Sequence, residues 1–187
     1  MAEDTEAKIE QLDGWIRACV QCPLHQSRKN AVPGEGPVDA GVMLIGEAPG
    51  AREDEQGRPF VGPAGDALDE VLAEVGIERA ELYITSVVKC RPPENRNPHT
   101  EEFTTCCALW LERQIELIDP DMLVAMGKVA MRAVLDERGK LEDLHGRTRR
   151  AAGRPCMITY HPAASMRFPQ VEARFREDLR KLKADIE

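Results

Sequence analysis

Four short apolar segments separated by helical stretches constrain the fold of this chain more than any other feature. Hydrophobic residues run through residues 42–47 (VMLIGE), 81–90 (ELYITSVVKC), 122–127 (MLVAMG) and 155–161 (PCMITYH). Patterns typical of helices occupy residues 5–17, 66–75, 100–118, 128–137 and 171–186. Strands that alternate with helices form a parallel sheet with helices on both faces. The pattern therefore predicts an α/β fold with four parallel strands.

The length and organisation of the chain indicate one domain. A chain of 187 residues is long enough for one full hydrophobic core and short for two. It has no internal repeat, low-complexity tract or long linker. No apolar run approaches the roughly 18 residues of a membrane helix, and the start, MAEDTEAKIEQLDGW, lacks the features of a targeting peptide. We expect a cytoplasmic protein, a single domain over residues 1–187, without membrane association.

Polar or reactive side chains stand at the carboxyl ends of the predicted strands. Ligand sites of open α/β folds lie beyond these ends. Gly46 and Glu47 end the first strand, Ser86 and Cys90 lie toward the end of the second, and His161 ends the fourth. A lone histidine is more often structural, but one at a strand end can donate to a developing negative charge or act as a general acid or base. This convergence predicts an active site.

Four cysteines have the spacing of a metal site. Cys19 and Cys22 form a CxxC pair in a polar loop, and Cys90 and Cys106 lie on either side of a proline-rich loop. In a cytosolic protein such thiols are more often metal ligands than disulfides. The set suits a tetrahedral zinc or a [4Fe–4S] cluster, and spacing alone does not choose between them.

Two further cysteines need separate interpretation. Cys107 follows Cys106 on one predicted helix, and the two side chains point about 100° apart, so only one can face a given metal. Spacing does not select which. Cys156 lies inside a predicted strand and is interpreted as a buried thiol.

The loop after the first strand, residues 46–65 (GEAPGAREDEQGRPFVGPAG), is rich in glycine. Glycine allows the backbone to approach a ligand closely, but the loop is neither a GxGxxG motif nor a P-loop. Phe60 is an aromatic side chain in these polar surroundings. It is expected either to stack on a flat ring or to anchor the loop to the core.

Charge is distributed unevenly along the chain. The net charge of −8 argues against nucleic-acid binding. Residues 144–183, however, contain ten Lys and Arg against three Asp and Glu, a local charge of +7. This segment is either a phosphate-binding face or a solvated helix surface, and the sequence leaves both open.

These motifs together resemble the family 4 uracil-DNA glycosylases, the iron–sulfur branch of the uracil-DNA glycosylase superfamily. The resemblance extends over nearly the whole chain. It is carried by GEAPG at 46–50, EDEQGRPFVGPAG at 53–65, YIT at 83–85, VVKCRPP at 87–93, NR at 95–96, HPA at 161–163 and the four cysteines. It implies a three-layer α/β/α sandwich around a central four-stranded parallel sheet. It also implies a structural [4Fe–4S] cluster held by Cys19, Cys22, Cys90 and Cys106, with Cys107 spare.

The resemblance implies a DNA-repair activity. A monomeric enzyme would flip uracil out of single- or double-stranded DNA and hydrolyse its N-glycosidic bond, leaving an abasic site. Phe60 would stack on the base, while Gly46, Glu47 and Ala48 would line the pocket. His161 would donate to uracil O2 as charge builds there. Glu47 would position water or stabilise the cationic sugar, since Ala48 has no group that could act as a base.

Two departures from the family pattern bear on specificity. Ser86 stands where family members carry an asparagine that reads the base edge, and serine makes one such contact at best. The large apolar residue that usually follows HPA is replaced by small ones, so Met166 or Arg167 would have to enter the base stack. Two alternatives follow: a related glycosylase with altered base preference, or a uracil-DNA binding protein that traps its product and turns over weakly.

Overall fold

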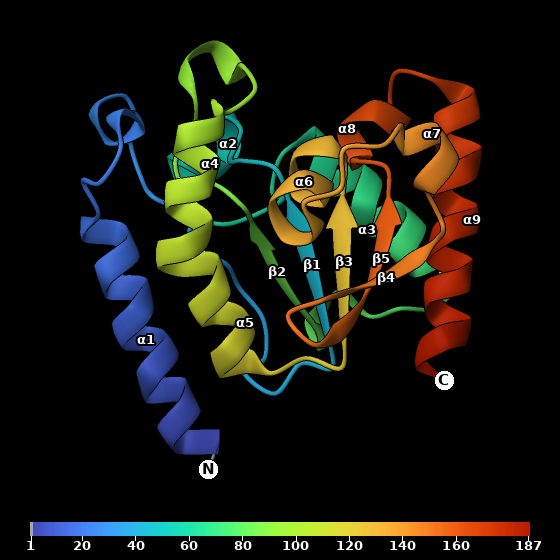
Figure 1. The fold of residues 1–187 in the computed structure, drawn as a ribbon, viewed down its shortest axis with the longest axis horizontal. Coiled ribbons are helices and arrows are strands. Elements are labelled where there is room, and N and C mark those ends of the chain that lie inside the picture. Colours follow the sequence, from blue (N-terminus) through green and yellow to red (C-terminus); the bar gives the residue numbers. More distant parts are fainter. Residues whose placement is uncertain (1) are drawn as a thin grey trace.

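A central five-stranded sheet organises the computed structural model, which describes residues 2–187, with side chains from residue 4 onward (Figure 1). The strand order is β2-β1-β3-β5-β4. The strands are β1 (Val42–Gly46), β2 (Leu82–Ser86), β3 (Met122–Met126), β4 (Thr148–Ala151) and β5 (Arg154–Thr159). Strands β2, β1, β3 and β5 are parallel neighbours, which confirms the predicted α/β fold with four parallel strands.

The fifth strand, β4, was not predicted. It pairs antiparallel with β5, from Thr148 opposite Met157 to Ala151 opposite Arg154. Its sequence, TRRA, is charged, and its first three residues are exposed. Strand formation at this edge therefore depends on the hydrogen bonds of the hairpin with β5 rather than on burial. The prediction of a four-stranded sheet is corrected to a mixed sheet with one antiparallel edge strand.

Strand β2 ends at Ser86, four residues earlier than the predicted strand. After Ser86 the chain leaves the sheet, and the amides of Val87 and Val88 donate to the carbonyl oxygens of Gly46 (3.0 Å) and Glu47 (3.0 Å). The prediction of one strand that continues from Ser86 to Cys90 is therefore wrong. These hydrogen bonds direct the chain across the end of β1 and on to Cys90.

Helices cover both faces of the sheet and make three layers (Figure 1). Met43 and Ile45 of β1 face a core formed with α1, α4, α5 and α6, whereas Val42 and Leu44 face a core formed with α3, α7 and α9. The alternation follows from the two-residue period of a strand. The helices are α1 (Ala2–Ala18), α2 (Ala51–Gln56), α3 (Pro63–Val75), α4 (Thr100–Cys106), α5 (Glu112–Ile118), α6 (Lys128–Leu135), α7 (Leu141–Leu144), α8 (Pro162–Ser165) and α9 (Pro169–Ile186).

The predicted helices are present with shifted ends, and one contains a π-helical segment. The helix predicted over 100–118 is α4 and α5 joined by the π-helical residues Cys107–Leu111. Helix α2 occupies part of the segment predicted as a long loop, and it ends at Gly57 in a left-handed conformation (φ 70°). None of the helices described in residues 2–187 combines the length and apolar character that crossing a membrane requires.

Candidate active site and metal centre

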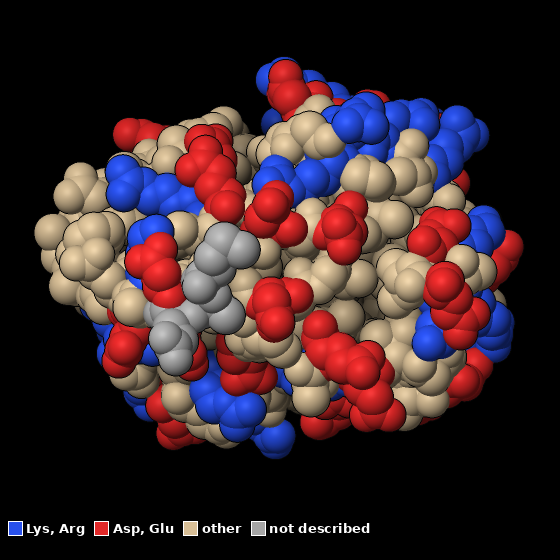
Figure 2. Space-filling view, turned by 90° about the horizontal axis from the view of Figure 1, so that it is seen from below, with Lys and Arg blue, Asp and Glu red and all other residues tan. Residues whose placement is uncertain are grey.

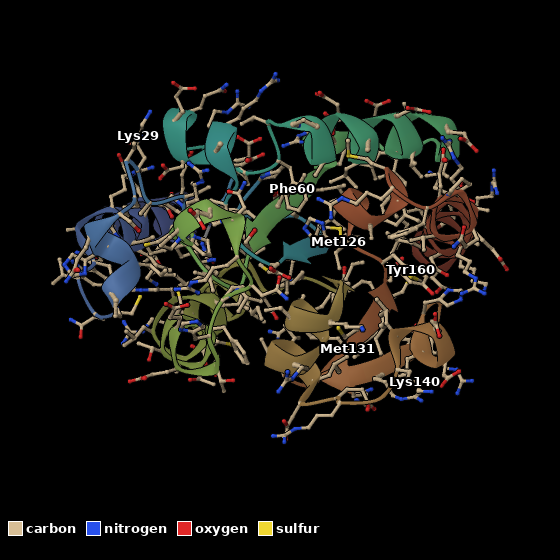
Figure 3. All side chains as sticks on the ribbon, turned by 90° about the horizontal axis from the view of Figure 1, so that it is seen from above. Lys29, Phe60, Met126, Met131, Lys140 and Tyr160 are labelled. Carbon is tan, nitrogen blue, oxygen red and sulfur yellow. The ribbon has the colours of Figure 1, made fainter. Side chains whose placement is uncertain are left out.

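The carboxyl ends of the parallel strands bring the predicted site residues together. Gly46 at the end of β1 pairs with Ser86 at the end of β2, and Met126 at the end of β3 pairs with Thr159 near the end of β5. His161 follows two residues after Thr159. Figure 3, viewed from this side, shows Phe60 and Met126 near the middle of the view.

Gly46 lies against two other predicted site residues. A Cβ atom placed on Gly46 would be 2.6 Å from Cζ of Phe60 and 3.2 Å from Oγ of Ser86. These contacts leave no room for a side chain at position 46. The Phe60 ring, 7% exposed, therefore covers the backbone at the end of β1 beside the Ser86 hydroxyl.

His161 is held as a neutral hydrogen-bond donor. Its Nδ1 accepts a hydrogen bond from the Ala163 amide (3.1 Å), and burial lowers the pKa of His161 to about 4, opposed by the charge of Glu53. A neutral imidazole has one acceptor and one donor nitrogen, so the proton is on Nε2. The imidazole is stacked on Phe60 with ring centroids 5.6 Å apart. The site thus combines an aromatic face with a neutral N–H donor.

Gly127 allows this placement of His161. It has a φ of 91°, and a Cβ atom there would be 3.1 Å from Cβ of His161. Its amide donates to the Thr159 carbonyl (2.8 Å), which fixes the end of β3 against the end of β5.

Glu47 and Ala48 follow Gly46 along the chain. Burial raises the pKa of the Glu47 carboxyl above its usual range. Ala48 is partly buried and packs against the core on the α1 side of the sheet. Its methyl group cannot take a proton from water.

Ser86 lies above a buried network that sequence reasoning missed. Lys89, 1% exposed, donates through Nζ to the Ser86 carbonyl (2.7 Å), Thr85 Oγ1 (2.6 Å) and Gln114 Oε1 (2.6 Å). All three protons of the ammonium group are therefore satisfied. Because Cys90 follows directly, this network links the end of β2 to a predicted metal ligand. The lysine of the VVKC motif was the only indication of this buried network in the sequence.

The four predicted metal ligands line one cavity. Cys19, Cys22, Cys90 and Cys106 surround it with Arg28 and other side chains. Arg28 donates through Nη1 to Cys90 Sγ (2.9 Å) and through Nη2 to the Arg17 carbonyl (2.9 Å). Among the residues that the structure describes, there is no group of three or more His, Cys, Asp or Glu side chains that could hold a metal ion. The four thiols border a shared space without converging on one ion.

Cys106 and Cys107 face different parts of the molecule. Cys106 lines the cavity of the four thiols, whereas Cys107 lies in a separate groove beside α6, with its Sγ 3.8 Å from the Ala133 carbonyl oxygen. The π-helical segment begins between them. Cys156 is completely buried in β5, and all six cysteines are free thiols.

Helix α2 connects the segment that carries Phe60 to the loop after the first two cysteines, and sequence reasoning missed this link. Glu53 Oε1 accepts from the amides of Val61 (2.9 Å) and Gly62 (2.8 Å), next to Phe60. Asp54 Oδ1 accepts from the amides of Lys29 (2.8 Å) and Asn30 (3.2 Å), on the side of the cysteine loop. The acidic pair in EDEQG was the signal available in the sequence.

Exposed apolar side chains lie just after α8, five to seven positions beyond His161. Met166 is 54% exposed and Phe168 is 51% exposed, with the exposed Arg167 between them. Ser165, by contrast, is buried and donates to the Pro162 carbonyl (2.6 Å). Phe168 was not among the predicted DNA contacts, although an aromatic residue so soon after HPA was visible in the sequence.

The positive charges of residues 144–183 are of two kinds. On α9, Arg176 pairs with Glu70, Glu74 and Glu172, and Arg180 also pairs with Glu74. On β4 and just before it, the exposed side chains of Arg147, Arg149 and Arg150 have no carboxylate within 4.0 Å among the described residues. Figure 2, viewed from the side opposite the carboxyl ends of the parallel strands, shows Asp and Glu over much of this face and the largest group of Lys and Arg at its upper right.

Comparisons with known proteins show to which superfamily this chain belongs. The family model of the uracil DNA glycosylase superfamily matches residues 33–183. A protein named type-4 uracil-DNA glycosylase from Pyrobaculum aerophilum is 46% identical over 179 residues, which cover 91% of this chain and 91% of that protein. A type-4 uracil-DNA glycosylase from Thermotoga maritima is 41% identical, covering 97% of this chain and 96% of its own.

The type-5 branch is less similar. A protein named type-5 uracil-DNA glycosylase from Pyrobaculum aerophilum is 36% identical and covers 84% of this chain and 86% of its own. Both identity and coverage are higher for the two type-4 proteins named above. The chain belongs to the uracil-DNA glycosylase superfamily and, within it, to the type-4 family.

Proposed function

We propose that this protein removes uracil from DNA by hydrolysing the bond between the base and the deoxyribose, and that His161 stabilises the departing base. The observation that carries this proposal is the placement of His161, whose Nδ1 accepts from the Ala163 amide, so that Nε2 is left to donate, and whose ring is stacked on Phe60. The similarity to proteins named type-4 uracil-DNA glycosylases supports the substrate.

Cleavage of the bond places negative charge on the uracil oxygen to which His161 would donate its hydrogen bond. When the bond between uracil N1 and sugar C1′ breaks, the electron pair leaves with the base and spreads onto O2. A hydrogen bond from Nε2 to that oxygen grows stronger as the charge develops, and such a contact is worth about 3–4 kcal/mol in comparable sites. A neutral imidazole can donate this hydrogen bond from Nε2 while its Nδ1 keeps the hydrogen bond from the Ala163 amide.

The other predicted residues act on the base and the sugar. Phe60 stacks on uracil, while the backbone of Gly46 and the side chains of Glu47, Ala48 and Ser86 line the pocket. The Glu47 carboxyl lies next to the sugar that becomes positively charged and orients the attacking water. Met166 and Arg167 contact DNA around the extruded nucleotide, since the exposed Met166 is large enough to fill the vacated space.

We propose that Cys19, Cys22, Cys90 and Cys106 hold a [4Fe–4S] cluster. The fit rests on four thiols around one cavity and on the adjacent Arg28 and Lys89, whose charges oppose that of four thiolates. Membership of the type-4 family supports a cluster rather than a zinc ion. Such a cluster would supply a cross-link between α1, the end of β2 and α4, and thereby order the loops that face DNA.

Further proposals concern the domain organisation, the oligomeric state, the DNA substrate and the location of the protein. We propose that residues 1–187 act as one domain and as a monomer, on single- and double-stranded DNA, in the cytoplasm. Six cysteines without a disulfide are consistent with a reducing compartment.

The two alternative functions are not favoured. The similar proteins are named uracil-DNA glycosylases, which gives no support to another base or to a binding protein. The trapping alternative would require a histidine in the loop after β2. Asn95 stands near that position here, and its Oδ1 accepts a hydrogen bond from Arg91 (2.8 Å). His99 begins α4, with its side chain 70% exposed and its Nδ1 3.9 Å from Glu102.

The test is excision from labelled oligonucleotides that carry uracil, hypoxanthine or xanthine, as single strands and duplexes. We expect alkali-labile abasic sites only where uracil stood, lost in His161→Ala and retained in His99→Ala, the exposed matched control. An alkali-resistant shifted band would indicate covalent trapping instead. Absence of cleavage at all three bases would refute the proposed function.

A further inference from the structure

The backbone of Phe60 has a conformation that is unfavourable for a residue with a bulky side chain. Its φ is 49°, in the left-handed region that glycine adopts readily and bulky residues rarely do. Such a conformation persists only where the surrounding structure imposes it. Residues that impose it on Phe60 therefore determine where the aromatic face of the pocket lies.

Arg79 binds the carbonyl group of Phe60 and that of the preceding residue, Pro59. Its Nη2 donates to the Pro59 carbonyl (2.9 Å), and its Nη1 donates to the Phe60 carbonyl (3.2 Å). The guanidinium itself is fixed by Glu35 (3.0 Å) and Asp69 (2.8 Å). One planar group thus binds two consecutive carbonyl oxygens and two carboxylates, a pattern that only arginine can provide.

Glu53 binds the amide groups of the two residues that follow Phe60, Val61 and Gly62. Its Oε1 accepts from Val61 (2.9 Å) and Gly62 (2.8 Å), while its Oε2 accepts from Gly50 (3.1 Å). The hydrogen bonds to Val61 and Gly62 are charge-assisted and short. The same carboxylate therefore connects the segment after Phe60 to Gly50, at the start of α2.

Close packing completes the restraint on Phe60. A Cβ atom at Gly65 would be 2.0 Å from the Phe60 carbonyl oxygen, and one at Gly46 would be 2.6 Å from the Phe60 ring. The backbone is thus pressed against α3 while the ring lies on the end of β1 and beside His161, with centroids 5.6 Å apart. Small shifts of the 59–62 segment would be transmitted to the ring.

We propose that Arg79 and Glu53 are positioning residues of the glycosylase, which together hold Phe60 in its left-handed conformation so that its ring is ready to stack on the extruded base. The inference rests on the proposed function. Neither residue touches the base in this role. Both act through the four backbone groups of residues 59–62, and their effect on excision requires the Phe60 ring.

A double-mutant cycle tests this dependence. Arg79→Met and Glu53→Ala are each combined with Phe60→Ala, and single-turnover excision is measured on a single-stranded oligonucleotide containing uracil. Each single variant is expected to lower the apparent second-order rate about tenfold, which corresponds to about 1.4 kcal/mol. In the Phe60→Ala background the same change should lower this rate less than twofold. Inhibition by free uracil should weaken by a similar factor.

Conservative variants and a matched control separate positioning from general damage. Glu53→Gln keeps an acceptor oxygen for Val61 and Gly62, so it should restore most of the activity lost in Glu53→Ala. Arg79→Lys keeps the positive charge but not the planar guanidinium that binds both carbonyl groups, so it should restore little of the activity lost in Arg79→Met. Arg58→Met removes an exposed arginine that also pairs with Glu35 but does not reach the carbonyls of residues 59 and 60. It should retain full activity.

Amide hydrogen exchange provides a measurement that does not depend on excision. The Val61 and Gly62 amides should exchange at least tenfold faster in Glu53→Ala, while amides of β3 remain protected. Equal losses of activity in the Phe60 and Phe60→Ala backgrounds, or unchanged exchange at Val61 and Gly62, would overturn the proposal. If the unmodified protein excises no uracil, the proposed function fails, and the exchange result still decides whether Glu53 restrains this segment.

Discussion

Substitution of Gly46 by alanine tests the geometry of the pocket with the smallest possible change. The added Cβ would lie 2.6 Å from Cζ and 2.8 Å from Cε2 of Phe60, whereas nonbonded carbons are comfortable at about 3.5–4.0 Å. The ring must therefore retreat by about 1 Å. It cannot do so freely, because it is buried and stacked on His161. On the other side, the new methyl group would meet Ser86 Oγ at 3.2 Å.

A displacement of this size has a predictable consequence. A misplacement of about 1 Å at a reacting site costs about 10²-fold in rate, or about 2.7 kcal/mol in the barrier. Overpacking in a buried site costs about 1–3 kcal/mol of folding stability. We therefore expect Gly46→Ala to fold, to melt at a lower temperature and to excise uracil about 10²-fold more slowly.

The assay is single-turnover excision from an end-labelled single-stranded oligonucleotide, with thermal unfolding measured on the same samples. Gly41→Ala is the matched control, because it lies next to the other end of β1 and its Cβ would meet only Asp121 Oδ2, at an ordinary 3.5 Å. In a Phe60→Ala background, adding Gly46→Ala should lower the rate of uracil excision only slightly further. If Gly46→Ala excised uracil within threefold of the unmodified protein, the close contact between β1 and Phe60 would not be part of the working pocket.

Three further predictions concern the histidine, the cysteines and the serine. Because the pKa of His161 is lowered to about 4 in the folded protein, from about 6.5 when unfolded, its stabilising contribution is present above pH 6.5 and is lost as the pH falls toward 4. Denaturant unfolding at pH 5 should show a loss of about 2 kcal/mol that is absent in His161→Gln; an equal loss in both would contradict this. Cys90→Ala should abolish absorbance near 400 nm, whereas Cys156→Ala, which changes a thiol outside the cavity, should retain it; absorbance that persisted in Cys90→Ala would refute the ligand set. Ser86→Asn, which adds a donor and an acceptor, should strengthen inhibition by free uracil relative to cytosine about tenfold, and Ser86→Ala should weaken it, so an unchanged ratio in both would show that position 86 does not read the base.

The sequence predicted the features that depend on local pattern and on spacing. Apolar runs such as VMLIG and MLVAM located the parallel strands because these strands are buried on both faces, and such strands read as continuous apolar runs. The cysteine spacing identified a set of thiols that does line one cavity. The family resemblance, confirmed by the comparisons, selected Cys106 over Cys107, and the structure places only Cys106 in that cavity.

The features that the sequence did not predict depend on contacts between distant segments. The charged segment TRRA becomes β4 because β5 supplies its hydrogen bonds, and Val87 leaves β2 because its amide binds the Gly46 carbonyl. Likewise, Arg79 lies 19 positions after Phe60, and no periodicity connects them. Phe60 illustrates the limit. Of the two roles expected for it, the structure shows the anchoring one, because its side chain packs in the core, and it adds a stacking contact with His161 that no sequence pattern indicated.

The central claim, that His161 serves as a neutral donor through Nε2, is tested most directly by nitrogen-15 NMR of the imidazole ring in the unmodified protein. The shifts of the two ring nitrogens report the tautomer, and their pH dependence reports the pKa. We predict a proton on Nε2, an unprotonated Nδ1 that accepts from the Ala163 amide, and a pKa of about 4. A proton on Nδ1, or a titration near the ordinary histidine value of about 6.5, would contradict the account.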